Sequence, residues 1–133
     1  AEELLWHRLF ISERHRQDMA DIVHLMVCVG HAMDWNRILH KTAEHWPLLL
    51  AQVQMFDYVY PEHRDGVPRW VREQLLDRAR TESARERSGE RVTRGPLISR
   101  FSFTICGAAF TTVGAGAIYS AGGFETSTRE RAK

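Results

Sequence analysis

The chain has 133 residues, which is long enough for one domain with a single hydrophobic core but too short for a catalytic domain plus a separate substrate domain. Its formal net charge is only +1, because lysine and arginine nearly balance aspartate and glutamate. Acidic and basic residues alternate along most of the chain, and this mixing gives no general electrostatic case for binding nucleic acid or a membrane surface. We therefore expect one domain followed by a tail.

The two cysteines, Cys28 and Cys106, lie far apart and belong to no CxxC pair or other zinc-site spacing. We interpret both as buried free thiols in preference to a disulfide. The first three residues, Ala1 to Glu3, include two acidic residues where a secretory signal would be basic, and no apolar run follows them. This pattern predicts a cytoplasmic protein.

Apolar residues at helical spacing predict two helices near the N-terminus. The first is expected over residues 2–14, and the second over residues 18–29. Gly30 stands where the second helix should stop, and the broad apolar face of that helix predicts that it is largely buried. The apolar side of the first helix is formed by Leu5, Trp6, Leu9 and Phe10.

Three further helices are marked by residues that favour helix starts. Asp34 is a suitable N-cap for a helix over 35–44, Pro47 opens a helix that runs to about Tyr58, and Pro68 opens another after a turn at 62–66. The inward-facing side chains are expected to be Ile38 and Leu39 in the first of these helices, and Trp70, Val71, Leu75 and Leu76 in the last. Beyond Ala79 the last helix carries a mixed run of charges and should extend into solvent.

The residues after Pro96 have a different composition. The stretch 97–105 is rich in aromatic and β-branched residues and predicts a short strand. Glycine, alanine, serine and threonine dominate residues 107–123, which predicts a poorly ordered tail, with a packed hairpin or a partner-binding segment as alternatives. A membrane span is disfavoured there, because these residue types give a marginal hydrophobicity.

These elements predict the fold class and its divisions. The chain should be mainly α, a compact bundle of about five short helices with a short C-terminal strand and a Gly/Ala-rich tail. We expect a helical domain over 1–92, an extended segment over 93–106 and a flexible tail over 107–133.

The sequence contains no complete catalytic motif. Its seven histidines lack the spacing of a helical metal site, and the phosphate-binding pattern GxxxxGK[ST] is absent. Nucleotidyl transfer would need carboxylates that hold magnesium, commonly an Asp-x-Asp pair, and none is present. The nearest carboxylates are Asp18 and Asp21, one helical turn apart and just after Arg14 and Arg16, and by themselves they predict a capped, salt-bridged helix start.

Several segments nevertheless resemble a known family. Residues 3–10 (ELLWHRLF) and 13–25 (ERHRQDMADIVHL) look like the helical part that follows the catalytic sheet in bacterial nucleotidyltransferase-like proteins of the minimal and AbiEii-related type. Further similar segments follow in the same order: Leu39 with 44–49, Phe56 with 59–61, 67–68 with 70–71, and 97–100. Together they cover most of the first three quarters of the chain.

The resemblance implies a non-catalytic helical portion of a nucleotidyltransferase-fold protein, which helps to form a nucleotide or acceptor pocket. The Gly-Ser turn and Asp-x-Asp strand of the family have no counterpart here, so the chain looks like a truncated relative that is inactive alone. Arg8 would face the nucleotide phosphates, with Arg14 and Arg16 nearby, because guanidinium groups bind phosphate oxygens in pairs of hydrogen bonds. A solvated surface is the competing interpretation of all three, and the favoured one for the latter two.

The same resemblance sets expectations for cofactors and partners. No cofactor belongs to this chain, and Mg²⁺ is implied only for a complete nucleotidyltransferase. The expected partners are a catalytic half or another protein, a nucleotide, and a second copy of the chain. If a catalytic half is missing, the isolated chain should expose an apolar patch.

Two rival hypotheses come from the residues. A stand-alone helical interaction module, a regulator or antitoxin-like partner, would use the charged helix over 69–91 and the apolar tail, and it predicts a closed core and a homo-oligomer. An independent enzyme with a histidine cluster would need several imidazoles to converge.

Overall fold

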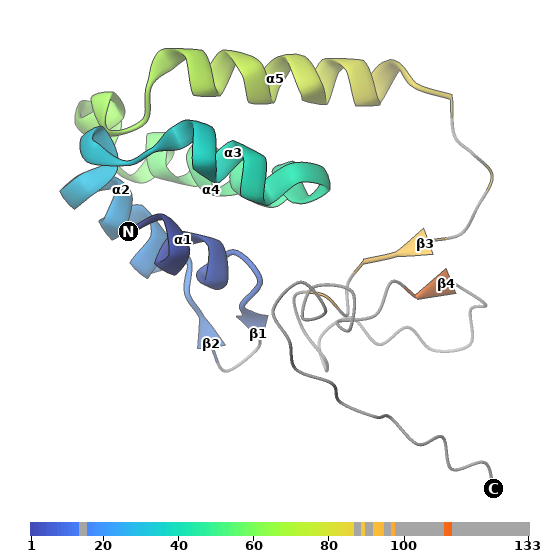
Figure 1. Cartoon of the computed structure of the whole chain (residues 1–133), viewed down its shortest axis with the longest axis horizontal. Coiled ribbons are helices and arrows are strands. Elements are labelled where there is room, and N and C mark those ends of the chain that lie inside the picture. The colour runs from blue at the N-terminus through green and yellow to red at the C-terminus, as the bar shows by residue number, and fades with distance from the viewer. Residues whose placement is uncertain (14–15, 87–88, 90–91, 95–96, 98–110, 113–133) are drawn as a thin grey trace, which may run out of the picture.

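Five α-helices make up most of the part of the chain that the computed structural model describes, namely residues 1–13, 16–86, 89, 92–94, 97 and 111–112. Their bounds are α1 Glu2–Arg8, α2 Met19–Val29, α3 Trp35–Thr42, α4 Trp46–Val59 and α5 Arg69–Ala84 (Figure 1). Short 3-10 turns follow three of the helices: η1 Gly30–Ala32, η2 Ala43–His45 and η3 Pro61–Gly66. The predicted mainly helical class is confirmed.

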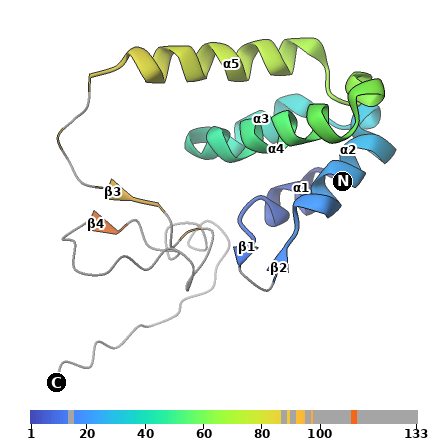
Figure 2. The same ribbon diagram turned by 180° about the vertical axis from the view of Figure 1, so that it is seen from behind.

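The core lies around α4. This helix contacts α2 on one side and α5 on another, and α1 packs against both α2 and α3. Figures 1 and 2 show α5 lying along one side of the molecule, with α3 and α4 between it and α1. The side chains that are completely covered come from every helix: Leu5, Ile22, Met26, Ile38, Leu49, Val53, Phe56, Val71 and Leu75.

The predicted helix starts are confirmed. The Asp34 side chain accepts a hydrogen bond from the Arg37 amide at 3.0 Å, so it caps α3. Pro47 lies in the first turn of α4, and Pro68 is the N-cap residue of α5. The capping residue and the two prolines each act within one helical turn, so the local sequence is sufficient to predict where these helices begin.

The first helix is shorter than predicted. It ends at Arg8, and the chain then forms a two-residue antiparallel hairpin in which β1 (Ser12–Glu13) pairs with β2 (Arg16–Gln17). The amide of Ile11 donates to the carbonyl of Arg8 at 3.1 Å, which closes a turn directly after the helix. The apolar spacing up to Phe10 continues through this turn, which is why periodicity overestimated the helix.

Three predicted burials are wrong. Trp70 and Leu76 are 42% and 37% exposed, whereas Val71 and Leu75 beside them are completely covered. The main neighbour of α5 is α4, so only one narrow stripe of α5 is covered. Cys28 is an exposed free thiol, because it lies on the outer face of α2.

Few of the C-terminal predictions fall on described residues. β3 (Val92–Thr93) pairs in parallel with β4 (Thr111–Thr112), the latter inside the segment predicted as a tail. Of the strand expected over 97–105, only Leu97 is among the described residues. Most of 107–133 also lies outside them. Among the helices that the structure describes, none combines the length and the apolar composition of a membrane span.

Two carboxylates near the N-terminus join α1 to α3 and predict an acid-sensitive contact. Glu2 accepts a hydrogen bond from the Asp34 amide at 2.9 Å, and Glu3 pairs with Arg37 and Lys41. The hydrogen bond from Asp34 lowers the pKa of Glu2 from 4.5 to about 2, and the hydrogen bond from Lys41, followed by that from Arg37, lowers the pKa of Glu3. A carboxyl group whose pKa is lowered in the folded state stabilises the fold at every pH above its unfolded-state pKa. The stabilisation from Glu2 should therefore disappear as the pH falls from 4.5 toward 2.

We therefore expect Glu3→Gln to lower the free energy of unfolding at neutral pH, and this difference from the wild type to disappear at a pH low enough to protonate Glu3 in the folded chain. Urea denaturation at a series of pH values from neutral into the acidic range measures this difference. Glu62→Gln is the control, because Glu62 is exposed and forms no ion pair with any described residue. Parallel pH profiles for the wild type and the Glu3 variant would contradict the assignment.

Candidate functional site

Arg8, the arginine singled out by the family resemblance, lies in a cluster of opposite charges. It ends α1, and its Nη1 donates to Asp18 Oδ2 at 2.8 Å and also pairs with Asp21. Asp18 is the N-cap residue of α2, although its side chain makes no capping hydrogen bond. The helix start is salt-bridged as predicted, but through Arg8 on α1, and the predicted side-chain cap is wrong because Asp18 makes no capping hydrogen bond.

The structure gives less on the other two predicted arginines. The backbone of Arg16 lies in β2, and Arg14 lies outside the described residues. Neither can be compared with Arg8 at the level of side chains. Their proposed role next to a phosphate stays a prediction.

Arg8 also borders an open hollow of about 290 Å³ on the surface of α1 and α2. Its lining is Leu4, Arg8, Asp21, His24, Leu25, Cys28 and Val29. The charge of Arg8 is already opposed by two carboxylates, and a phosphate placed here would meet Asp21, whose side chain is half exposed. This arrangement disfavours an anionic ligand.

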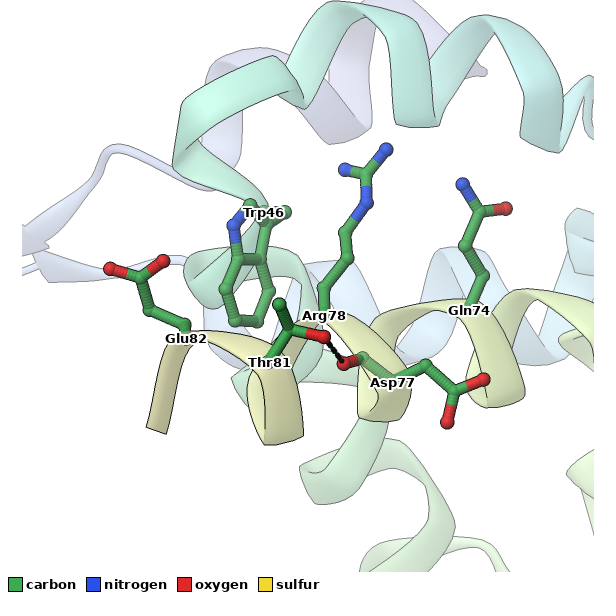
Figure 3. A pocket seen from close by; sticks show the side chains of 6 residues that line it. All are labelled: Trp46, Gln74, Asp77, Arg78, Thr81 and Glu82. Atoms are coloured by element: carbon green, nitrogen blue, oxygen red, sulfur yellow. Dashed lines mark hydrogen bonds between the residues drawn. The ribbon is translucent and has the colours of Figure 1, made fainter. Parts of the chain in front are cut away.

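A larger hollow of about 580 Å³ lies where the N-terminal end of α4 faces the C-terminal half of α5 (Figure 3). We call it the α4–α5 cleft. Its lining is Trp46, Gln74, Asp77, Arg78, Thr81 and Glu82. The volume falls within the range of about 300–1,000 Å³ that is typical of small-molecule sites.

The helices fix the positions of these side chains. Gln74, Arg78 and Thr81 recur every three or four residues, so they lie along one stripe of α5. From Gln74 to Glu82 the stripe is about 12 Å long, at 1.5 Å per residue. Trp46 is the first residue of α4 and is partly buried against the hydrophobic core, which holds its ring at one end of the cleft.

The charged side chains of the cleft differ in whether they form ion pairs. Asp77 pairs with Arg80 at 2.6 Å, and Glu82 lies 3.7 Å from the guanidinium of Arg85. Arg78, by contrast, forms no ion pair and no side-chain hydrogen bond with any residue that the structure describes. Its guanidinium is therefore available to an anion.

Figure 3 shows the directions of these side chains. Arg78 and Gln74 extend from α5 to the side on which Trp46 lies, and the carboxylate of Asp77 points away from them. Thr81 donates its hydroxyl to the backbone carbonyl of Asp77 at 2.9 Å, so it is already occupied. The cleft thus combines an aromatic ring, an amide and a guanidinium that has no ion pair within the part of the chain that the structure describes.

Three of the histidines pack against aromatic rings. His24 and His63 each have their ring centre 6.1 Å from that of Tyr60, and His45 packs edge-on against Phe10 at 5.2 Å. In the described part of the chain, no three or more histidine, cysteine or acidic side chains are placed to hold a metal ion. The described geometry therefore gives the histidine-cluster enzyme no support.

Sequence reasoning missed the residues that line this cleft. The sequence pattern singles out neither Gln74, Asp77 nor Arg78, the residues beyond Ala79 are predicted as a solvated, mixed-charge run, and Trp46 belongs only to the segments that resemble the family. The available signal was the four-residue spacing of Gln74 and Arg78, which places both on one side of a helix. Nothing in the sequence showed that Trp46 would lie opposite them.

Comparison with known proteins adds no name to this site. No family model matches the chain, and no curated protein or solved structure matches it significantly. The function is therefore argued from the residues of this chain.

Proposed function

We propose that this chain is the non-catalytic helical portion of a nucleotidyltransferase-fold protein and that it helps to form a nucleotide or acceptor pocket. The observation that carries the proposal is Arg78, a guanidinium without an ion pair among the described residues, in one cleft with the ring of Trp46. A nucleotide offers a planar base and an anionic phosphate. Aromatic side chains stack on bases, and arginine binds phosphate oxygens in pairs of hydrogen bonds.

The cleft suits this role better than the hollow beside Arg8. A phosphate at Arg8 would compete with Asp18 and Asp21 for the same guanidinium, whereas a phosphate at Arg78 would displace no ion pair among the described residues. We therefore assign the phosphate-binding role to Arg78. Arg8 is better placed to hold the end of α1 against the start of α2.

The proposal includes a missing catalytic part. The chain has no Asp-x-Asp pair, so Mg²⁺ and the transfer step would belong to a partner that supplies the catalytic sheet. Five large apolar side chains are exposed on α1, α4 and α5, and we expect a partner of this kind to cover part of them. They are Leu4, Tyr58, Val59, Trp70 and Leu76.

A stand-alone interaction module is the second candidate, and one observation favours it. Residues 80–86, which include the last turn of α5, are all exposed and carry mixed charges, and the ion pairs of Arg80 and Glu82 are formed only with residues three positions away on the same segment. Such a surface is suited to binding another protein. This candidate predicts a discrete homo-oligomer and no binding of nucleotides.

Calorimetric titration of the purified chain distinguishes the two candidates. The ligands are the four nucleoside triphosphates with magnesium and the corresponding monophosphates. We expect at least one nucleotide to bind, and Arg78→Gln to weaken it about tenfold, because hydrogen bonds to a charged group contribute about 1.5–3 kcal/mol.

Arg69→Gln is the matched control for this titration. Arg69 lies on the same helix but is 89% exposed at its far end, so its removal should leave the affinity unchanged. Equal affinities of the Arg78 variant and the wild type would remove the cleft from the proposal. Absence of binding together with a discrete oligomer by size-exclusion mass measurement would favour the interaction module.

A further inference from the structure

We infer that His24 and Cys28 form one half of a zinc site, which the same two residues of a second copy of this chain complete. The inference does not depend on the proposed function, and it concerns the hollow on α1 and α2 instead of the α4–α5 cleft. It starts from the spacing of the two side chains along α2 and from the surface around them.

The two side chains lie about one helical turn apart on α2. Residues four positions apart are neighbours on the surface of a helix, and two metal ligands at this spacing can hold one ion together. His24 and Cys28 have this spacing, both are exposed, and both line the same hollow. No two histidines of the sequence are three or four positions apart, so the pair is found only when the cysteine is included.

The chemistry of this pair favours zinc over magnesium and calcium. Zinc prefers thiolate and imidazole ligands, whereas magnesium and calcium prefer oxygen atoms. Cys28 is a free thiol on the surface, so it is open to an ion. The thiol releases its proton to the solvent when the ion binds, because the ligand is the thiolate.

One copy of the chain supplies too few ligands for zinc. Structural zinc ions almost always have four, and in the described part of the chain no three histidine, cysteine or acidic side chains are placed to hold a metal ion. Asp21 lines the same hollow one turn before His24, but it is paired with Arg8. A second copy, related by a two-fold axis through the ion, supplies the same two ligands again. Two thiolates and two neutral imidazoles also balance the charge of the ion.

The surface beside the pair suits contact with a second copy. Leu4, Leu25 and Val29 line the same hollow, and Leu4 is 45% exposed. Two copies that meet around the ion would bring these apolar side chains together and remove them from water, which is favourable. Water molecules as the remaining two ligands would leave the same side chains exposed. The apolar surroundings therefore favour a second copy as the source of these ligands.

Titration of the full, reduced chain with zinc chloride tests this inference. Calorimetry gives the number of ions per chain, and size-exclusion mass measurement gives the number of chains per particle. We expect one zinc ion per two chains, and we expect the ion to convert a monomer into a dimer. Magnesium and calcium should have neither effect. Cobalt in place of zinc should give the visible absorption of a tetrahedral ion with thiolate ligands.

Two variants and two controls identify the ligands. Cys28→Ser and His24→Gln should each weaken zinc binding about a hundredfold or more and prevent the dimer, since losing a residue that only supports a ligand already costs about 10–100-fold. His63→Gln is a matched control, because His63 packs against the same Tyr60 ring but has no cysteine within four positions. Cys106→Ser, at the other cysteine of the sequence, should bind zinc like the wild type. Circular dichroism checks that each variant is folded.

Several results would overturn the inference. One is the absence of zinc binding, and another is one ion per chain without a dimer, because a single copy would then complete the site. A dimer that formed equally well with a chelator present would show that the ion does not join the copies. Loss of zinc binding in either control would show that the ligands are not His24 and Cys28 alone. None of these measurements involves a nucleotide, so the proposed function stands or fails separately.

Discussion

Replacement of Arg72 by methionine is expected to lower the free energy of unfolding by about 3 kcal/mol, the lower end of the usual cost of removing one partner from a buried ion pair, because this pair is part-buried. The guanidinium forms two bonds with Asp57, from Nε to Oδ2 at 2.8 Å and from Nη2 to Oδ1 at 2.7 Å. These two side chains are only 16% and 14% exposed. Arg72 also donates to the carbonyls of Arg64 and Val67, so it holds α4, η3 and α5 together. Methionine keeps the apolar stem but leaves Asp57 as an unpaired, largely buried carboxylate.

Urea denaturation at neutral pH measures this effect, and α5 offers a matched control. Arg69 pairs with Glu73 at 2.7 Å on the surface, with 89% and 56% of the two side chains exposed. Arg69→Met should therefore change the free energy of unfolding by no more than about 0.5 kcal/mol. A double variant with Asp57→Leu and Arg72→Met should recover part of the loss, because it leaves no buried charge unpaired. If the two single arginine variants were equally stable, the bonds of Arg72 would not hold α5 in place.

The starts of the helices could be predicted because their causes are local. Asp34 caps α3 through an amide only three residues away, and Pro47 favours the first turn of α4 by its own ring. The mainly helical class follows from the same signals together with the apolar spacing. None of these causes depends on how the helices pack.

The packing of the helices could not be predicted, because it joins residues far apart in the sequence. Arg72 and Asp57 are fifteen positions apart, and either could have been a solvated surface charge. The apolar spacing of α5 identified a face but not its width, so Trp70 and Leu76 were placed inside with their buried neighbours. The apolar face that the sequence gives α5 is wider than the stripe that its one neighbouring helix, α4, covers.

The candidate site shows the same division. The sequence named Arg8, Asp18 and Asp21 separately, but the ion pairs of Arg8 with both carboxylates depend on how α1 meets α2. Arg78 and Trp46 lie together only because α4 and α5 pack side by side. Whether a charged side chain is already paired depends on its neighbours in space, and the sequence alone does not give these neighbours.

Gly30→Ala is expected to lower the free energy of unfolding by about 2–3 kcal/mol, the upper part of the usual range for inserting a carbon into a well-packed interior. Gly30 has a right-handed helical conformation, with φ of −56°, so alanine fits its backbone angles. In an open helical turn this substitution stabilises a protein by about 0.4–1 kcal/mol. Here the added Cβ would lie 2.2 Å from the carbonyl oxygen of Gly66, where η1 meets η3. The close approach of two backbones, rather than a left-handed conformation, therefore requires glycine at the end of α2.

Thermal and urea unfolding of three variants test this reason. Gly66→Ala probes a neighbouring close approach between η3 and the end of α2, since its Cβ would lie 2.6 Å from the carbonyl oxygen of Met26, and it should destabilise the fold similarly. Ala32→Ser adds one atom at an exposed position of the same turn and should change stability by no more than about 0.5 kcal/mol. If Gly30→Ala raised the melting temperature, the two backbones would not be in contact and Gly30 would only mark the end of a helix. Lower stability of both glycine variants would instead show that the contact between α2, η1 and η3 leaves no room for an added side chain.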